Sequence, residues 1–376
     1  MEHYLDNAAT TKPCAEAAAA VMSCISSHYG NPSSLHRKGL EAQHEVEYAR
    51  NQVAGALGCK AQEIVFTSGA TESTNLALCG AAAAYGRKRK KIITSAVEHA
   101  SVRETMAHLE TLGFTVVSVP PAEDGLYHAE DFLKEVDKDT CLVSIMLVNN
   151  ENGYRMPVEE VFRTVKRRDP DIITHCDAVQ GFLKVSFKPR TLCADLVSLS
   201  GHKVHALKGA GALYIRQGVR LKPVLYGSRQ EKGLRPGTEG VPVIAAFGAA
   251  AEKLVLTMDE RYDAVSRLRS SLIEQLKEMD GVIIRDLPSA SPYVLNISLL
   301  GYRSEIVLHY LEQREVYISS GSACSKGASS GVLELFGAKP AEVDSALRIS
   351  FCSDNTEEDI AALVQGLKDA QRDLMH

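Results

Sequence analysis

The chain has 376 residues, which is long enough to bury a sizeable core without disulfides or a structural metal. Hydrophobic residues make up 45% and charged residues 24%, which excludes collagen, coiled coil and wholesale disorder. The 42 basic and 47 acidic residues give a formal net charge of −5. A mildly acidic chain has no general attraction for nucleic acid or for an anionic membrane surface, so we expect neither as a partner.

The first residues are polar and lack the basic and then apolar pattern of a secretory signal. No apolar run approaches the roughly 18 residues of a membrane span. The nine cysteines are scattered, and none forms a Cys-x-x-Cys pair, so we expect no metal site of that kind. Reduced thiols in a cytoplasmic protein are the simplest interpretation.

From about residue 60, short apolar runs rich in β-branched residues alternate with longer amphipathic segments. Strands are expected at Glu63–Thr67, Lys91–Ser95, Thr115–Val119, Leu142–Val148, Asp171–His175, Asp195–Leu199 and Gly211–Ile215. Helices are expected around 71–86, 100–112, 129–136, 158–168 and 241–277. This alternation predicts an α/β fold with a mostly parallel sheet and helices on both of its faces.

A shorter α/β pattern follows, with strands near 294–298, 316–319 and 346–350 and helices near 303–313 and 356–374. We therefore expect two domains. The large one spans residues 15–255, and the small one combines 1–14 with 256–376. The long helix expected over 241–277 joins them, and Pro242 suits its first turn.

Polar side chains gather where the expected strands of the large sheet end. In open α/β sheets, ligands bind outside the carboxyl ends of the strands. The five polar strand ends are Ser68-Gly69-Ala70-Thr71, Glu98-His99, Asn149-Asn150-Glu151, Asp177 and Ser200-Gly201-His202-Lys203. We expect these ends to form one site.

The stretch from Phe66 to Ser73 reads as a strand, a glycine turn and a helix that is opened by Thr71 and Glu72. The free N–H groups and the positive pole of such a helix can bind a phosphate. The same residues also suit an ordinary helix cap, so the pattern alone leaves both interpretations open. The chain lacks the Gly-x-x-x-x-Gly-Lys-Ser/Thr motif, so a nucleotide P-loop is not supported.

Two charged residues at strand ends are candidates for chemistry. Most lysines are solvated, but Lys203 follows a buried type of strand and precedes the glycine-rich stretch 208–211. Desolvation there would lower its pKa and free the amine to form a Schiff base. Asp177 in an interior crevice needs a cationic partner, and the protonated ring nitrogen of a cofactor would serve.

The segment 319–331 consists almost entirely of small residues and contains Cys324. It reads either as a flexible linker with an incidental cysteine or as a segment that uses its thiol. An exposed thiol is prone to oxidation, which favours the second interpretation.

Four motifs together carry a specific resemblance: Ser-Gly-His-Lys at 200–203, His-Cys-Asp-Ala-Val-Gln at 175–180, Arg-Pro-Gly-Thr-Glu at 235–239 and Ser-Ser-Gly-Ser-Ala-Cys at 319–324. The sequence resembles the pyridoxal-phosphate (PLP) enzymes of the aspartate-aminotransferase fold, class V branch, and within it the cysteine desulfurases. The resemblance runs over residues 4–360, nearly the whole chain.

For the cofactor, the resemblance implies that Lys203 carries PLP as an imine. Asp177 would pair with the ring nitrogen and Gln180 with the ring hydroxyl, while His99 would stack on the ring and assist proton transfer. The implied phosphate ligands are Ala70, Thr71, Ser200, His202 and, from a neighbouring subunit, Thr238. A homodimer with shared active sites is therefore expected.

For the substrate, the resemblance implies that Arg348 binds the α-carboxylate of L-cysteine and that Asn150 contacts the adduct of cofactor and substrate. The thiolate of Cys324 would take the sulfur as a persulfide, leaving alanine, and pass it to an acceptor protein for iron–sulfur cluster assembly or for thiolation of tRNA or a cofactor. Because the chain ends soon after its last expected helix, the acceptor stays open. The alternatives are a selenocysteine lyase, another class V aminotransferase, or a non-catalytic partner that carries a thiol.

Overall fold

The computed structural model describes residues 2–321 and 331–374. Its largest element is a seven-stranded sheet in the order β2-β8-β7-β6-β5-β3-β4. The strands are β2 (Ile64–Thr67), β3 (Lys91–Ser95), β4 (Thr115–Val119), β5 (Thr140–Met146), β6 (Ile173–Asp177), β7 (Leu196–Ser200) and β8 (Gly211–Ile215). Strands β4, β3, β5, β6 and β7 pair in parallel, and β8 runs antiparallel to both of its neighbours. The expected α/β class and mostly parallel sheet are confirmed.

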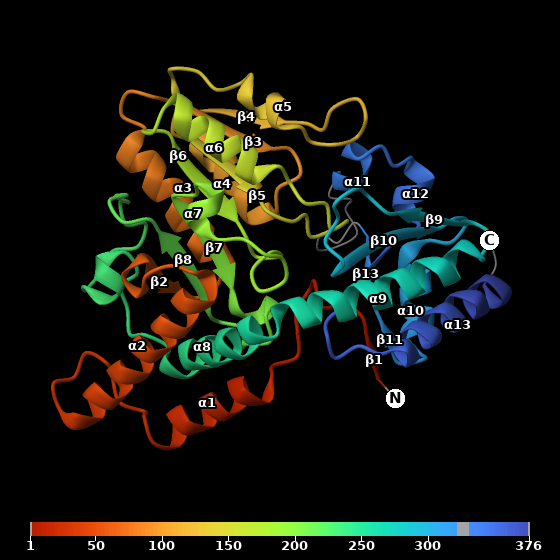
Figure 1. The fold of residues 1–376 in the computed structure, drawn as a ribbon, viewed down its shortest axis with the longest axis horizontal. Coiled ribbons are helices and arrows are strands. Elements are labelled where there is room, and N and C mark those ends of the chain that lie inside the picture. The colour runs from red at the N-terminus through yellow and green to blue at the C-terminus, as the bar shows by residue number, and fades with distance from the viewer. Residues whose placement is uncertain (1, 322–330, 375–376) are drawn as a thin grey trace.

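Helices cover both faces of this sheet (Figure 1). Helices α3 (Ala70–Tyr85) and α4 (Ala100–Thr111) pack on one face, where apolar side chains of both helices and of six strands form one core. On the other face a larger core includes α2 (Arg37–Leu57), α6 (Val158–Arg168) and α8 (Val241–Leu256). A sheet buried on both faces explains why its strands read as continuous apolar runs.

The remaining elements of this half are short or lie before the region of alternation. Helix α1 (Ala15–Ser26) packs on α8 rather than on the sheet, and α5 (Ala129–Leu133) and α7 (Pro189–Leu192) are single turns. The sequence analysis predicts neither α1 nor α2, since both precede the region in which strands and helices alternate.

A second, four-stranded antiparallel sheet has the order β12-β13-β10-β9. It consists of β9 (Val282–Arg285), β10 (Val294–Leu299), β12 (Ser319–Ser320) and β13 (Ala346–Ser350). A parallel pair, β1 (His3–Tyr4) with β11 (Val316–Tyr317), ties the N-terminus to this half. The sequence analysis missed β9, although Val282–Arg285 contains three consecutive β-branched apolar residues; all four residues of the strand are half-buried.

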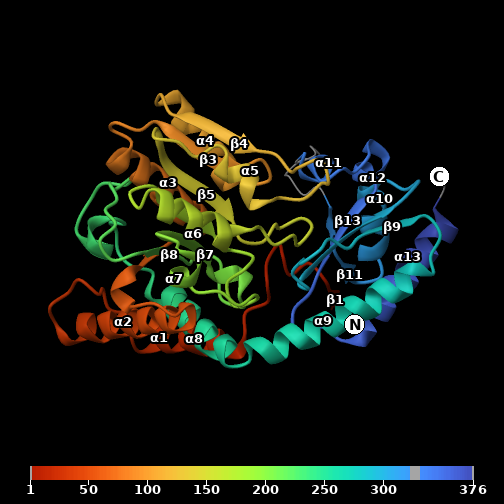
Figure 2. The ribbon, with the colours of Figure 1, turned by 45° about the horizontal axis from the view of Figure 1, so that its top comes forward.

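The helices of the smaller half are α9 (Met258–Lys277), α10 (Ser304–Glu312), α11 (Val332–Leu335), α12 (Pro340–Asp344) and α13 (Glu357–Asp373). Side chains of α9, α10 and α13 form a separate apolar core with β10 and β13. Figure 2 shows α9 and α13 side by side along this half, with the N-terminal segment entering between the two sheets.

The single helix expected over 241–277 is wrong, because α8 and α9 meet at a bend of 76° at Thr257. Asp259 and Glu260 favour the start of a new helix there, since acidic groups stabilise a helix N-terminus. Arg261 donates to the Leu254 carbonyl at 2.8 Å and so satisfies an acceptor that the end of α8 leaves open.

Among the described residues, no single helix is long and apolar enough to cross a membrane; α8 and α9 reach that length and composition only as a bent pair.

Candidate active site

One cavity of about 530 Å³ lies at the carboxyl ends of the parallel strands and extends to the second sheet. Ten of the predicted site residues line it: Ala70, Thr71, His99, Asn150, Asp177, Gln180, Ser200, His202, Lys203 and Arg348. Thr238 does not line it; it is exposed on a loop elsewhere on the same chain. Cys324 lies outside the described residues.

The floor of the cavity at α3 is suited to an anion. The helix begins after Gly69, and no side chain caps its first N–H groups. Strand β8 lies directly against this turn: a Cβ atom on Gly211 would come within 2.6 Å of the Gly69 backbone. The hydroxyl of Ser200 is buried beside the cavity and has no hydrogen-bond partner among the described residues. Uncapped N–H groups, an unpartnered hydroxyl and a helix N-terminus together are suited to bind an anion such as a phosphate.

The Lys203 amine is held by the N-terminal segment. Its Nζ donates to the carbonyl oxygens of Ala8 at 2.7 Å and Ala9 at 2.6 Å. Burial, together with the positive charge of Arg348, lowers the pKa of Lys203 to about 8. A fraction of the amine is therefore unprotonated near neutral pH, as a nucleophilic amine requires.

Asp177 is the last residue of β6 and is almost fully buried. Its Oδ1 accepts a hydrogen bond of 3.0 Å from the Val179 backbone N–H. Burial raises the pKa of Asp177, with the Val179 hydrogen bond acting in the opposite direction. A cationic ligand in the cavity would stabilise the ionised carboxylate, because it would bring a positive charge close to the buried side chain.

His99 caps α4 with its Nδ1 atom, which accepts from the Ser101 backbone N–H at 3.1 Å. In the neutral ring this contact assigns the proton to Nε2. Burial lowers the pKa of His99, so the neutral form dominates at pH 7. Its neighbour Glu98 does not line the cavity; it is buried and accepts from the Met146 backbone N–H at 2.9 Å.

The sequence analysis missed Lys184, which fixes the orientation of Gln180. Lys184 Nζ donates to Gln180 Oε1 at 2.9 Å, and Gln180 Nε2 donates to the Ala8 carbonyl at 2.9 Å. Both contacts require the same amide orientation, with Oε1 toward Lys184 and the NH₂ group toward the Ala8 carbonyl. Burial lowers the pKa of Lys184 to about 7. The apolar residues on both sides of Lys184 in the sequence were the available signal.

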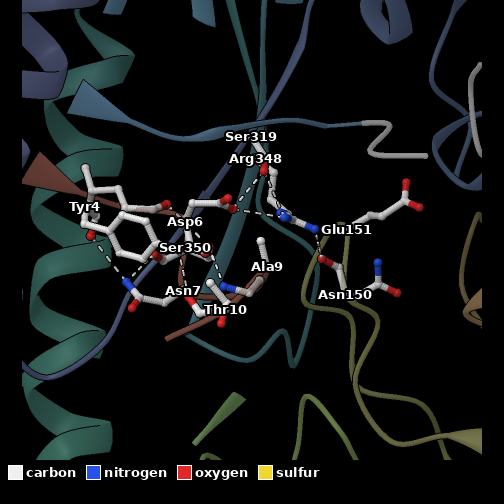
Figure 3. A network of polar contacts seen from close by, with 12 residues as sticks. Tyr4, Asp6, Asn7, Ala9, Thr10, Asn150, Glu151, Ser319, Arg348 and Ser350 are labelled. Carbon is white, nitrogen blue, oxygen red and sulfur yellow. Dashed lines mark hydrogen bonds and ion pairs between the residues drawn. The ribbon is translucent and has the colours of Figure 1, made fainter. Parts of the chain in front are cut away.

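Arg348 lies on β13, at the side of the cavity formed by the second sheet (Figure 3). Its Nη1 donates to the Asn150 carbonyl at 3.1 Å, and its Nη2 pairs with Asp6 Oδ1 at 3.0 Å. The Ser319 hydroxyl accepts from Nη2 at 3.1 Å and donates to Asp6 at 2.8 Å. Asp6 and Ser319 were not predicted as site residues, although both belong to stretches that carry the family resemblance.

The comparisons with known proteins agree over nearly the whole chain. Residues 3–363 match the family described as "Aminotransferase class-V". A protein named "Cysteine desulfurase" from Nostoc sp. is 39% identical over 366 residues, which cover 96% of this chain and 91% of that protein. "Cysteine desulfurase IscS" from Dictyoglomus turgidum is 39% identical over 87% of this chain and 83% of its own length.

Solved structures show the same likeness. A structure titled "NIFS-LIKE PROTEIN" has a TM-score of 0.94 and 37% identity and covers 100% of both chains. The structure of DndA from Streptomyces lividans has a TM-score of 0.78 and 35% identity and covers 93% of this chain and 99% of its own. The chain therefore belongs to the class V aminotransferase family and, within that family, to the cysteine desulfurases.

Proposed function

We propose that this protein is a PLP-dependent L-cysteine desulfurase that leaves alanine and places the substrate sulfur on Cys324. The observation that carries the proposal is one cavity that holds an amine of lowered pKa, a buried carboxylate, a neutral histidine, an uncapped helix N-terminus and an arginine. These are the groups that an amino-acid substrate and a phosphorylated aromatic cofactor need.

The residues present fit pyridoxal phosphate. Its phosphate suits the N-terminus of α3 with the unpartnered Ser200 hydroxyl, and its aldehyde suits the amine of Lys203. A protonated ring nitrogen would supply the cation that Asp177 lacks, and the NH₂ group of Gln180 suits the ring oxygen. When bound, this cofactor withdraws electrons from the substrate and makes its α-proton acidic.

The protein's own groups would then position the substrate and move its protons. Arg348 binds the carboxylate, since a planar guanidinium matches it in geometry and charge. The amine of Lys203, with a pKa of about 8, is suited to take a proton at neutral pH and return it. His99 presents Nε2–H as a donor on the same cavity. Asp177 would pair with the cofactor's ring nitrogen and favour its protonated form.

We infer that Cys324 attacks the substrate sulfur and later delivers it to an acceptor protein, in iron–sulfur cluster assembly or in thiolation of tRNA or a cofactor. The support is its place in the sequence: Ser319, five positions earlier, lines the cavity beside Arg348. Transamination has no use for such a thiol.

We infer a homodimer with shared sites. Large apolar side chains are exposed on α1, α2 and the adjoining loops, including Met22, Tyr29, Leu35 and Tyr226, which are 62%, 70%, 96% and 86% exposed. Apolar exposure of this extent is typical of a protein–protein interface. A second chain packed there would also give the exposed Thr238 a partner surface.

The test is mass spectrometry after L-cysteine is added to the purified protein. We expect one extra sulfur atom on the Cys324 peptide, and alanine as product; Cys324→Ala should abolish both. Full alanine and sulfide production by Cys324→Ala would contradict the persulfide step.

A second test concerns the cofactor. The purified protein should be yellow. Lys203→Ala should lose the absorption band of the bound cofactor, and its turnover should fall at least about 1000-fold. A colourless protein that PLP cannot reconstitute would favour the non-catalytic alternative.

A further inference from the structure

The guanidinium of Arg348 already engages two of its three nitrogen atoms. A guanidinium carries five N–H bonds: two on each Nη atom and one on Nε. Nη2 donates to Asp6 Oδ1 and to the Ser319 hydroxyl, and Nη1 donates to the Asn150 carbonyl. Nε is buried and has no hydrogen-bond partner among the described residues.

This arrangement opposes two-point binding of a second carboxylate. A carboxylate binds an arginine most strongly through two parallel N–H bonds. Such a pair is available only on the Nε/Nη2 edge or on the Nη1/Nη2 edge of the plane, and both edges include Nη2. An incoming carboxylate bound at two points must therefore compete at Nη2 with Asp6 and Ser319, which Figure 3 shows beside Arg348, and of these two only Asp6 also repels it by charge.

We propose that Asp6 is a resident competitor: it neutralises Arg348 in the empty site and is displaced from Nη2 when the carboxylate of the amino-acid substrate binds. The Ser319 hydroxyl, which donates to Asp6 at 2.8 Å, keeps the displaced carboxylate hydrogen-bonded. The inference rests on the proposed function, because the ligand is the carboxylate of the amino-acid substrate.

This competition discriminates between ligands. An arginine that is 4% exposed and unpaired would attract any small anion, whereas one already paired with Asp6 does not. A substrate whose amine is already held at Lys203 presents its carboxylate at a high effective concentration, and only such a tethered carboxylate competes well. Asp6 also acts on Lys203: Arg348 lowers the pKa of Lys203 and Asp6 raises it, so the charge of Asp6 partly offsets that of Arg348 at this amine.

The test is a titration of the cofactor-loaded protein, followed through the absorption of the bound cofactor, with two ligands. L-alanine carries an amine and a carboxylate but no thiol, and ethylamine carries the amine alone. Asp6→Asn should lower the Kd of L-alanine by roughly 5–20-fold and leave the Kd of ethylamine unchanged. Glu2→Gln removes an equal charge from the same segment at an exposed position and should change neither.

Weaker or unchanged binding of L-alanine by Asp6→Asn would overturn the inference; weaker binding would mean that Asp6 positions Arg348. Arg348→Ala separates this failure from failure of the proposed function. If Arg348 binds the carboxylate, Arg348→Ala removes the advantage of L-alanine over ethylamine, and adding Asp6→Asn to it gives no gain. If that advantage survives Arg348→Ala, the carboxylate binds elsewhere, and both proposals fall.

Discussion

The two sides of the active-site cavity hold their charges in different ways. On the side built by the seven-stranded sheet, and within the described part of the chain, Lys203 donates only to backbone carbonyls, Lys184 only to an amide, and Asp177 accepts only from a backbone N–H. Burial there shifts each pKa toward the neutral form. On the side built by the four-stranded sheet, Arg348 has a carboxylate partner at 3.0 Å.

The difference indicates different roles. Charges that lack a counter-ion are poised for a ligand that brings one, and they can exchange protons near neutral pH. A charge that is already paired exchanges one anion for another and needs no change in protonation. In the proposed function, chemistry therefore belongs to the first side and recognition of the carboxylate to the second.

The largest effect expected is that of Asp177→Asn, which breaks the charge pattern of the first side. Without the carboxylate the cofactor's ring nitrogen loses its anionic partner, and turnover of L-cysteine should fall about 10²–10⁴-fold. The cofactor band should persist, because Lys203 and the N-terminus of α3 are unchanged. Asp171→Asn, at an exposed position just before the same strand, is the matched control. A loss of less than threefold in kcat would contradict the assigned role.

Arg348→Ala tests the second side, and a smaller effect is expected there. Loss of charge-assisted hydrogen bonds of about 1.5–3 kcal/mol should raise KM for L-cysteine roughly 10–150-fold. Because the effect is on binding, kcat should change much less and the band of the bound cofactor should remain. If the band disappears as well, Arg348 supports the fold of the cavity rather than the substrate.

The first side was the easier one to predict from sequence. His99, Asp177 and Lys203 each follow or end a recognisable strand, and the topology of a parallel sheet brings such ends together. Asp6 and Arg348 are 342 positions apart and meet only because a backbone bridge joins Asp6 to Ser350, which no local pattern encodes. Lys184 was missed for a related reason, since a lysine in sequence gives no sign of which amide it will contact. At the helix break at Thr257, Arg261 also donates to the Leu183 carbonyl 78 positions away, a contact that no local pattern encodes.

Lys184→Met should give the smallest effect, and the effect is on the free energy of unfolding. It tests whether burial alone shifts the pKa of the groups on the first side toward their neutral forms. The folded chain holds the pKa of Lys184 at about 7, below the roughly 10.4 of a solvated lysine. Between these two values the unfolded chain binds one more proton, so this group makes the free energy of unfolding rise with pH. Below pH 7 both states are protonated, and the full cost of the buried charge remains.

Methionine has a similar size and no charge, so Lys184→Met removes this cost at the expense of one hydrogen bond to Gln180. We expect the variant to be more stable by about 1–2 kcal/mol at pH 7, with the gain shrinking steadily as the pH rises toward about 10. Urea unfolding at pH 7 and pH 9 measures the difference, and Lys138→Met, at an exposed position, controls for loss of a lysine. An equal difference at both pH values would mean that Lys184 keeps its ordinary pKa, and that the charges of the first side are stabilised by partners rather than suppressed by burial.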